Sequence, residues 1–365
     1  MRIVLFLAFL VPAVGSASSL SVVDLGNLGG AESVAYGVNS SGLAVGWASN
    51  GSGITNAFSS TGAGSPFDFS ALESYAYGVN GAGSVAGVFY ENGVSHGAIW
   101  VNGTMTDLGA GTSATSINDF GIAAGGNGQA IVYSDGQARE LGTLPGGNWS
   151  AAYGINNSSE VVGYGNTGGG AFLGFYWTGQ SLISIGTLGG SNSYAMGVND
   201  SGEIVGDAST AAGYLHAFAD SNGTLTDLGT LGGTSSYAYS VNDQGLVVGY
   251  STTADGATHA FLYQNGEMVD LNSLLPEGSG WVLVQAYGIN DQEQIVGTGL
   301  WNGQQEAFRL DLNSPSTSVS LASSPVPEPG AWILVLCGGA LVAVSFWLRR
   351  WFQGGNRRRS PQSQA

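Results

Sequence analysis

One unit repeats seven times between Ser21 and Leu312, and this repeat constrains the fold more than any other feature. Each copy contains an apolar segment that ends in asparagine, and a later pair in which alanine precedes phenylalanine or isoleucine. The asparagines, separated by 38 to 48 residues, are Asn39, Asn80, Asn118, Asn156, Asn199, Asn242 and Asn290. Two markers that recur seven times in register indicate one supersecondary unit stacked on its neighbours.

Each copy divides into four short β-type segments separated by turn residues. In the copy around Asn242, large side chains alternate with small or polar ones from Tyr237 onward, as in a half-buried strand. The Asn242–Gly245 turn predicts a tight connection to the next strand, and Asn265-Gly266 predicts a hairpin between the third and fourth segments. The three later β-rich runs are Leu246–Tyr250, His259–Tyr263 and Glu267–Leu271.

Four antiparallel strands in a unit of this length are typical of a β-propeller blade. The first segment, Ser21–Gly26, has the pattern of a fourth strand without the preceding three, and the last copy ends near Leu312 without a fourth. We therefore predict an all-β, seven-bladed propeller of four-stranded blades over residues 21–312. Val22 and Val23 should pair antiparallel with Ala307–Leu310 and close the ring. An open β-solenoid is the alternative, and it would need caps at both ends.

The two ends of the chain have the composition of targeting segments. Residues 1–17 run from Arg2 through an apolar stretch to small residues, which predicts a secretory signal. Residues 313–325 are rich in Ser, Thr and Pro and predict a linker. Residues 331–348 carry no charge and are long enough for a transmembrane helix. Because Arg349 and Arg350 follow at once, this flank is expected in the cytoplasm and the repeats outside.

This order of features closely resembles the PEP-CTERM sorting signal of exported bacterial proteins. The matching residues lie within residues 326–365 and comprise Pro327, Glu328, Pro329, the apolar span, Arg349 and Arg350. The tail after Arg350, which includes Arg357–Arg359, is longer than is usual in that family. The resemblance implies recognition by an exosortase, a membrane protease-transferase, in bacteria that make extracellular polysaccharide. A plain membrane anchor is the alternative.

The repeat itself resembles the HAF family of extracellular repeats. The name-giving residues stand at His216-Ala217-Phe218 and His259-Ala260-Phe261, and the segment DLGTLGG stands at Asp227–Gly233. The resemblance covers nearly all of Asp24–Leu312 and implies no established activity. Together with the sorting signal, it implies a protein held transiently in the inner membrane. From there it would reach the cell surface or extracellular matrix of a Gram-negative-type bacterium.

The charge of the predicted exterior part excludes some partners. Ser18–Pro325 contains two arginines, no lysine and 24 acidic residues, which gives a formal charge of −22. A surface of this sign repels nucleic acid and anionic lipid. The single cysteine, Cys337, lies in the predicted membrane span, so no disulfide is expected in the repeats.

The residues that could carry chemistry occupy repeat-equivalent positions. The only histidines precede the third segment of three copies, and such positions point alike around a ring rather than converging on zinc. We interpret them as structural residues bonded to a neighbouring turn. Four acids follow turn asparagines, and turn capping explains them better than calcium binding. The sequence predicts no cofactor, no metal site and no catalytic residue. The histidines are His96, His216 and His259, and the acids are Asp119, Asp200, Asp243 and Asp291.

The loops between the second and third strands vary most among the copies, and loops on a rigid scaffold often carry function. In a propeller these loops share one face with the connections between blades. That face is predicted to carry a candidate binding surface formed by Tyr90, Trp149, Tyr214 and Trp281. Exposed aromatic rings could stack on sugar rings. Alternatively, they fill gaps between the blades.

The sequence therefore favours an exported, non-enzymatic propeller with a binding or structural role. An exosortase-type enzyme is its expected sorting partner, and extracellular polysaccharide is a candidate ligand. A polysaccharide-active enzyme, a glycosidase or lyase, is the alternative. It would require paired carboxylates in a central cleft, and the repeated acids provide no such asymmetric pair. A scaffold without any ligand is a third interpretation.

Overall fold

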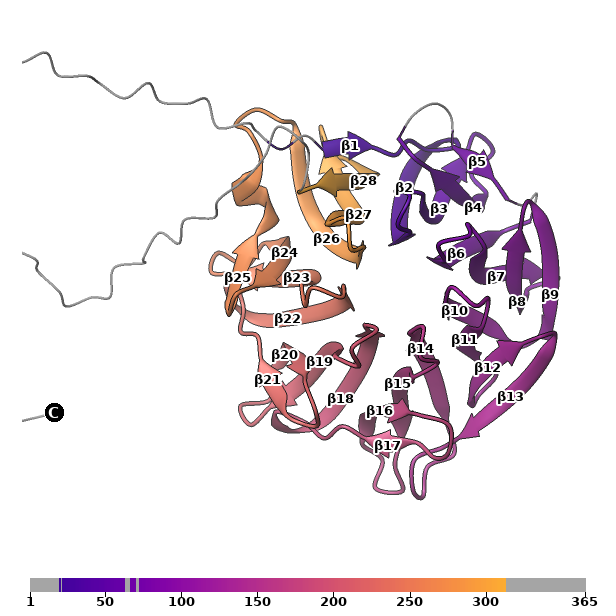
Figure 1. The fold of residues 1–365 in the computed structure, drawn as a ribbon. Coiled ribbons are helices and arrows are strands. Elements are labelled where there is room, and N and C mark those ends of the chain that lie inside the picture. Colours follow the sequence, from indigo (N-terminus) through magenta and orange to yellow (C-terminus); the bar gives the residue numbers. More distant parts are fainter. Residues whose placement is uncertain (1–19, 21, 63–65, 70–71, 313–365) are drawn as a thin grey trace, which may run out of the picture. The chain divides into compact units, whose positions relative to one another are not determined.

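A computed structural model describes residues 20, 22–62, 66–69 and 72–312. Within these residues the chain forms 28 strands and one short 3-10 helix, η1 (Leu271–Leu274). The strands make seven antiparallel sheets of four strands each, arranged as blades around an axis (Figure 1). The described part contains no helix with the length and apolar character needed to cross a membrane. The expected signal, linker and sorting segments, including the span 331–348, lie outside the described residues.

Each blade has an inner, a second, a third and an outer strand. The inner strands are β2 (Gly29–Val38), β6 (Ser74–Val79), β10 (Ser113–Ile117), β14 (Ser150–Ile155), β18 (Gly189–Val198), β22 (Gly232–Val241) and β26 (Trp281–Ile289). The second strands are β3 (Ala44–Asn50), β7 (Val85–Glu91), β11 (Ala123–Gly126), β15 (Val161–Asn166), β19 (Ile204–Thr210), β23 (Val247–Thr253) and β27 (Gln294–Trp301). The third strands are β4 (Thr55–Ser60), β8 (Val94–Val101), β12 (Ala130–Ser134), β16 (Phe172–Trp177), β20 (Leu215–Asp220), β24 (Thr258–Gln264) and β28 (Gln304–Asp311). The outer strands are β5 (Phe67–Asp68), β9 (Thr104–Ala110), β13 (Gln137–Gly142), β17 (Ile183–Ser184), β21 (Leu225–Asp227), β25 (Glu267–Asp270) and β1 (Val22–Asp24).

The ring is closed inside the seventh blade. The outer strand of that blade is β1, which pairs antiparallel with β28 (Figure 1). Val22 lies opposite Leu310, and Val23 lies opposite Arg309. The predicted closure is therefore confirmed, and the open solenoid is wrong. Because β1 covers the edge of β28, the last blade has no unpaired third strand on which another chain could add.

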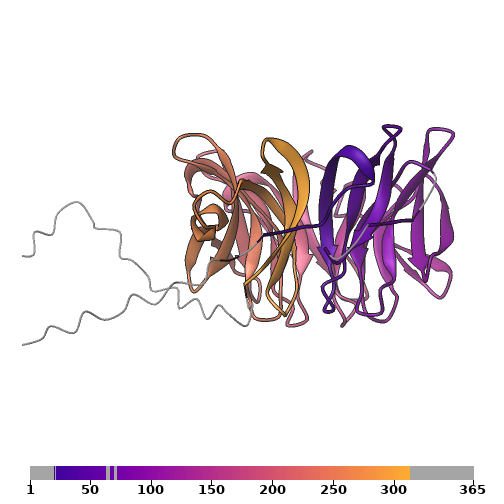
Figure 2. The same cartoon turned by 90° about the horizontal axis from the view of Figure 1, so that it is seen from above.

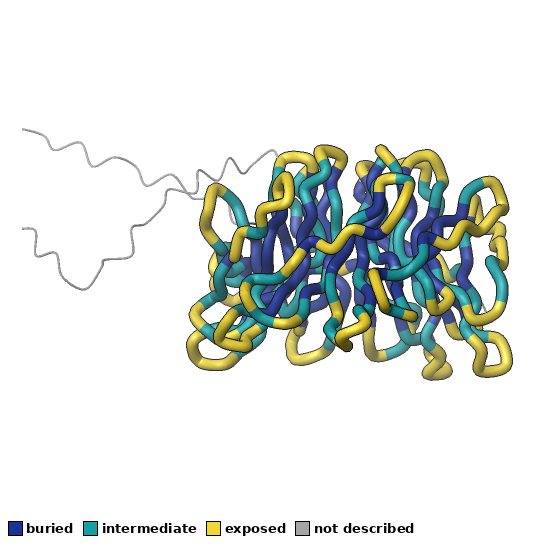
Figure 3. The backbone as a smooth tube through the Cα atoms, turned by 90° about the horizontal axis from the view of Figure 1, so that it is seen from below, coloured by how far each residue is buried: buried dark blue, intermediate teal, exposed yellow. Residues whose placement is uncertain are grey.

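The core lies between neighbouring blades, which stand side by side around the ring (Figure 2). Phe261 of the sixth blade belongs to one buried cluster with Val205 and Ala217 of the fifth. The repeated alanine-aromatic pairs supply this packing, since alanine lets the adjacent blade approach and phenylalanine fills the space. Figure 3 shows buried backbone through the middle of the ring and exposed turns at its two rims.

Every inner strand contains a β-bulge three residues before its turn asparagine. In β22 the register shifts between Ala238 and Ser240, which leaves Tyr239 as the extra residue, and the other six inner strands shift at the same place. The simple alternation expected from Tyr237 onward is therefore wrong at Tyr239. A bulge re-aims a side chain, and Tyr239 lines the central cavity. A glycine in the second strand permits this approach, because a Cβ on Gly249 would lie 1.9 Å from the carbonyl oxygen of Tyr237.

The predicted hairpins between third and outer strands are confirmed. Asn265 and Gly266 both have positive φ angles, 52° and 84°, as a tight hairpin with right-handed strand twist requires. Two turns after the inner strands reach the same left-handed region without glycine, at Ser159 (62°) and Glu293 (57°).

Candidate functional site

The inner strands surround a channel whose two ends differ. At one end lie the turns between inner and second strands, which carry the seven repeated asparagines; we call it the asparagine end. At the other end lie the second-to-third loops and the connections between blades; we call it the loop face. Between the two ends, residues of all seven inner strands line a cavity of about 740 Å³.

The seven asparagine side chains form a closed ring of hydrogen bonds. Asn39 Nδ2 donates to the carbonyl oxygen of Asn80 at 3.0 Å, and the next five asparagines repeat the contact from blade to blade. Asn290 then donates to the carbonyl oxygen of Asn39 at 2.8 Å. Each Oδ1 also accepts the N–H four residues later in its own turn. Each buried asparagine side chain therefore bonds both to its own turn and to the next blade, which is a structural role.

The acids that follow the asparagines bridge blades instead of capping their own turns. The N–H of Asp200 donates to Asp243 Oδ1 at 2.9 Å, and the N–H of Asp243 donates to Asp291 Oδ1 at 2.9 Å. Burial raises the pKa of Asp243, with the Asp291 and Asp200 carboxylates adding to the rise. Within the described residues, no group of three or more His, Cys, Asp or Glu side chains has the arrangement of a metal site. Turn capping within each acid's own turn was expected, and the contacts lie instead between the turns of neighbouring blades.

The three histidines bind aspartates of their own blades. His216 Nδ1 lies 2.9 Å from Asp227 Oδ2, and Asp227 Oδ1 accepts the N–H of Gly229. His96 and His259 make the same contact with Asp107 and Asp270. Each histidine thus fixes the aspartate that begins the connection to the next blade. This is the turn contact expected from the sequence.

A belt of tyrosines lines the channel. Five of the seven bulge positions carry tyrosine, and four of these rings touch in sequence around the axis, from Tyr239 through Tyr287 and Tyr36 to Tyr77. The ring centroids of Tyr36 and Tyr287 lie 4.9 Å apart, as do those of Tyr239 and Tyr287. Burial raises the pKa of all five phenols above their ordinary value, so the belt stays neutral at physiological pH. The five are Tyr36, Tyr77, Tyr153, Tyr239 and Tyr287.

An open groove of about 530 Å³ lies on the loop face beside this belt. It is lined by Trp149, Tyr164, Asn166, Phe172 and Tyr194, and we call it the aromatic groove. The centroid of the Tyr164 ring lies 5.5 Å from that of Trp149 and 4.8 Å from that of Tyr194. Asn166 Oδ1 accepts the backbone N–H groups of Asn148 and Trp149, at 3.0 and 2.8 Å. The loop that carries Trp149 is therefore held in place before any ligand arrives.

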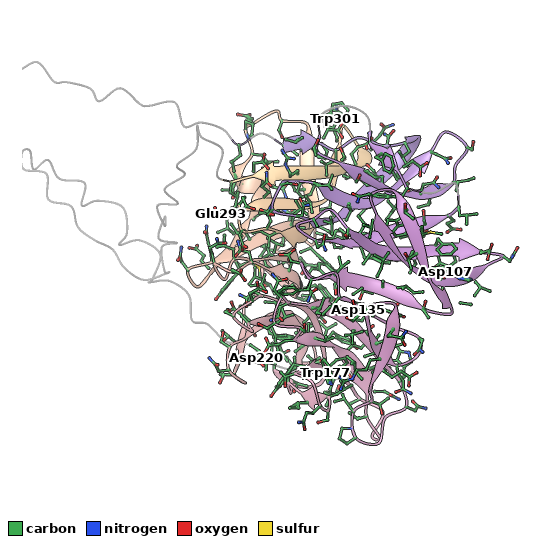
Figure 4. The ribbon with its side chains drawn as sticks, turned by 45° about the vertical axis from the view of Figure 1, so that its right-hand side comes forward. Asp107, Asp135, Trp177, Asp220, Glu293 and Trp301 are labelled. Carbon is green, nitrogen blue, oxygen red and sulfur yellow. The ribbon has the colours of Figure 1, made fainter. Side chains whose placement is uncertain are left out.

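The four predicted binding residues share the loop face but do not form one surface. Trp149 lines the aromatic groove. Tyr214 is 49% exposed in the β19–β20 loop. Tyr90 lines the central cavity and contacts Tyr75. Trp281 packs edge-on against Phe308 of its own blade and stacks on Trp301, which is labelled in Figure 4. The predicted sorting residues, from Pro327 to Arg350, lie outside the described residues.

Asp207 is a buried carboxylate that the sequence analysis did not single out. It lies in β19 opposite Tyr194 and is 4% exposed. Burial raises the pKa of Asp207 to about 7. A sequence signal existed, because Asp207 is the only acid among the seven residues that follow the second-strand glycines. The other six are Trp47, Val88, Gly126, Tyr164, Tyr250 and Thr298.

Comparisons with known proteins support the fold and leave the activity open. A family model described as a protein of unknown function (DUF3466) matches residues 191–326, most of the last three blades. No curated protein matches the chain. YCF48 from Cyanidioschyzon merolae is 10% identical with a TM-score of 0.50, over 82% of this chain and all of that one. A puromycin hydrolase mutant is 11% identical with a TM-score of 0.51, over 77% of this chain and 52% of that one. At such identities the likeness shows the propeller fold alone.

Proposed function

We propose that this chain is an exported bacterial protein whose propeller binds extracellular polysaccharide through the aromatic groove. The observation that carries the proposal is the groove itself. Four aromatic side chains line it, and Asn166 holds in place the loop that carries one of them, Trp149. Aromatic rings with one exposed face offer apolar area at low entropic cost, which suits the apolar face of a sugar ring.

Export and sorting follow from the chain ends in this proposal. Residues 1–17 have the order of a secretory signal, and Pro327, Glu328, Pro329, the span 331–348 and Arg349-Arg350 have the order of an exosortase signal. The acidic repeats fit a partner that is not a bare polyanion. A binding protein at the envelope or in the polymer matrix would account for both the chain ends and the acidic repeats. The described residues show no paired carboxylates converging on the groove, so a binding role is preferred over hydrolysis.

The test is retention of the folded domain on extracellular polysaccharide. Trp149→Ala should weaken binding about tenfold or more, equivalent to roughly 1.4 kcal/mol for each factor of ten. The loop should stay ordered, because Asn166 binds the backbone of residue 149 and not its side chain. Phe120→Ala is the matched control, since Phe120 is 74% exposed but belongs to a turn at the asparagine end. Equal retention of both variants would contradict the proposal.

A further inference from the structure

Asp207 interrupts the aromatic lining of the loop face. On one side, the contacting rings run through Phe172, Trp149, Tyr164 and Tyr194. On the other side, they run from Tyr250 through Tyr239 to Tyr287 and onward. Asp207 lies between the two runs, within electrostatic reach of the residues that flank the break, Tyr194, Tyr237, Tyr239 and Tyr250. The one carboxyl group here therefore lies among tyrosines.

Among the described residues, no arginine or lysine pairs with this carboxylate. The Asp207 side chain has no hydrogen bond or ion pair with any other described residue, although Asp207 is only 4% exposed. The chain contains no lysine. Of the two arginines among the described residues, Arg139 lies over the Trp177 ring (labelled in Figure 4) and donates to the carbonyl of Gly179. Arg309 is bound to Asp311. A buried carboxylate without a partner is costly when ionised, and neither of the described arginines provides its counter-charge.

The aromatic groove and this carboxylate share a neighbour, Tyr194. Tyr194 lines the groove and also lies directly opposite Asp207 in the β18–β19 pair. A ligand that stacks along Trp149 and Tyr164 therefore also contacts Tyr194, the strand partner of Asp207. Tyr194 and Tyr237 both interact electrostatically with the carboxylate, and tyrosine faces attract cations.

We propose that Asp207, flanked by Tyr194 and Tyr237, binds a protonated amino group, and that the ligand is an amino-sugar polymer with free amines. This inference rests on the proposed polysaccharide binding and names its substrate class. The ammonium group donates a charge-assisted hydrogen bond to Asp207, while neighbouring sugar rings stack in the aromatic groove. The strongly acidic domain attracts such a polymer over distance.

The experiment compares two oligosaccharides of equal length by calorimetry at pH 6 and low salt: a glucosamine oligomer with free amines, and its fully N-acetylated counterpart. The wild-type domain should bind the free-amine oligomer at least tenfold more tightly. Asp207→Asn should abolish this preference and leave weak binding of both oligomers. Asp220→Asn is the matched control, because Asp220 is a buried acid of the same blade at the asparagine end (Figure 4). It should keep the preference.

A second measurement uses the wild-type domain and needs no variant. The aspartate carboxyl carbons are observed by ¹³C NMR at pH 6, where Asp207 is largely protonated because burial raises its pKa to about 7. The free-amine oligomer should convert Asp207 to its ionised form, and the acetylated oligomer should not.

The outcomes separate the two proposals. If both oligomers bind equally and Trp149→Ala weakens both, polysaccharide binding stands and the amino-sugar inference is wrong. A preference that survives in Asp207→Asn also overturns the inference. Oligolysine of equal charge serves as a further probe: if it binds through Asp207 as tightly as the free-amine oligomer and is unaffected by Trp149→Ala, the ligand is a cationic peptide and the inference fails. If wild type retains no polysaccharide, both proposals fail.

Discussion

The side chain of each turn asparagine forms hydrogen bonds in its own blade and to the next blade. In the turn after β22, Asn242 Oδ1 accepts the N–H of Leu246, while Asn242 Nδ2 donates to the carbonyl of Asn290 in the next blade. Replacing this asparagine would leave the carbonyl of the next turn buried and without a hydrogen bond, which is costly. The recurrence of asparagine in all seven copies follows from this double contact.

Asp207 should make stability depend on pH. Its pKa is about 7 in the folded protein, where burial opposes ionisation, and about 4 in the unfolded chain. Below pH 4 both states hold the proton. Between pH 4 and 7 only the unfolded chain releases it, so stability falls as pH rises and stays low above pH 7. Asp207→Asn should remove this fall and gain on the order of a few kcal/mol over wild type at pH 8 but not at pH 4.

Urea unfolding at pH 4, 5.5 and 8, without added cations or oligosaccharide, measures the effect. Asp135→Asn is the control for the change from aspartate to asparagine itself, because Asp135 is exposed at a hairpin tip. A constant difference between Asp207→Asn and wild type from pH 4 to pH 8 would show that Asp207 ionises freely in the folded state.

At the scale of elements, the inner strands were the hardest part to predict. Their β-rich pattern was evident, but the bulge at Tyr239 was not, since a bulge keeps the same residues and shifts their directions. The need for Gly249, where a side chain would collide with the carbonyl of Tyr237, is evident only when the two strands are paired. The tyrosine belt was missed for this reason: under simple alternation, Tyr239 and Tyr237 share one side of the strand.

The closing strand should be essential to the ring. Deletion of residues 22–26 removes β1 and also Leu25, which is 1% exposed and donates its N–H to the carbonyl of Ala307. Loss of a buried leucine alone costs about 2–5 kcal/mol, and the bared edge of β28 should promote self-association. Denaturant unfolding and light scattering measure the two effects.

The control for this deletion is a double substitution, Val22→Thr with Val23→Thr, which keeps the backbone pairing to Leu310 and Arg309. It should remain monomeric and lose much less stability. If the deleted form is as stable as wild type, β1 does not close the ring in solution.

At the scale of the whole molecule, the repeat allowed the architecture to be predicted because seven copies carry the same signal. Contacts between copies could not be predicted in the same way: the bond from Asn242 to Asn290 joins residues 48 positions apart, and only the closed ring brings them together. The binding residues were chosen by loop position, which placed Trp149 in the aromatic groove but could not foresee that Trp281 packs against Phe308. Asp207 occurs once, so no repetition marked it.

The sorting proposal concerns the complete chain. In a host with an exosortase, the exported product should lack the span 331–348 and everything after it, because the enzyme acts at the signal that begins with Pro327. Intact-mass measurement of the exported protein gives the new end directly. The same chain in a host without an exosortase is the control and should keep its full C-terminal segment. A product that retains Arg357–Arg359 in the first host would favour the plain anchor.

The ring of asparagine hydrogen bonds also bears on how a gene of this kind can change. Every blade presents the same donor to one neighbour and the same acceptor to the other, including across the closure from Asn290 to Asn39. A duplicated repeat would carry both the asparagine donor and the carbonyl acceptor of this contact. Mutation could then change its loop-face residues without removing its bonds to the neighbouring blades. The asparagine end is thus uniform around the ring, whereas residues nearer the loop face differ from copy to copy, as Asp207 does in the fifth.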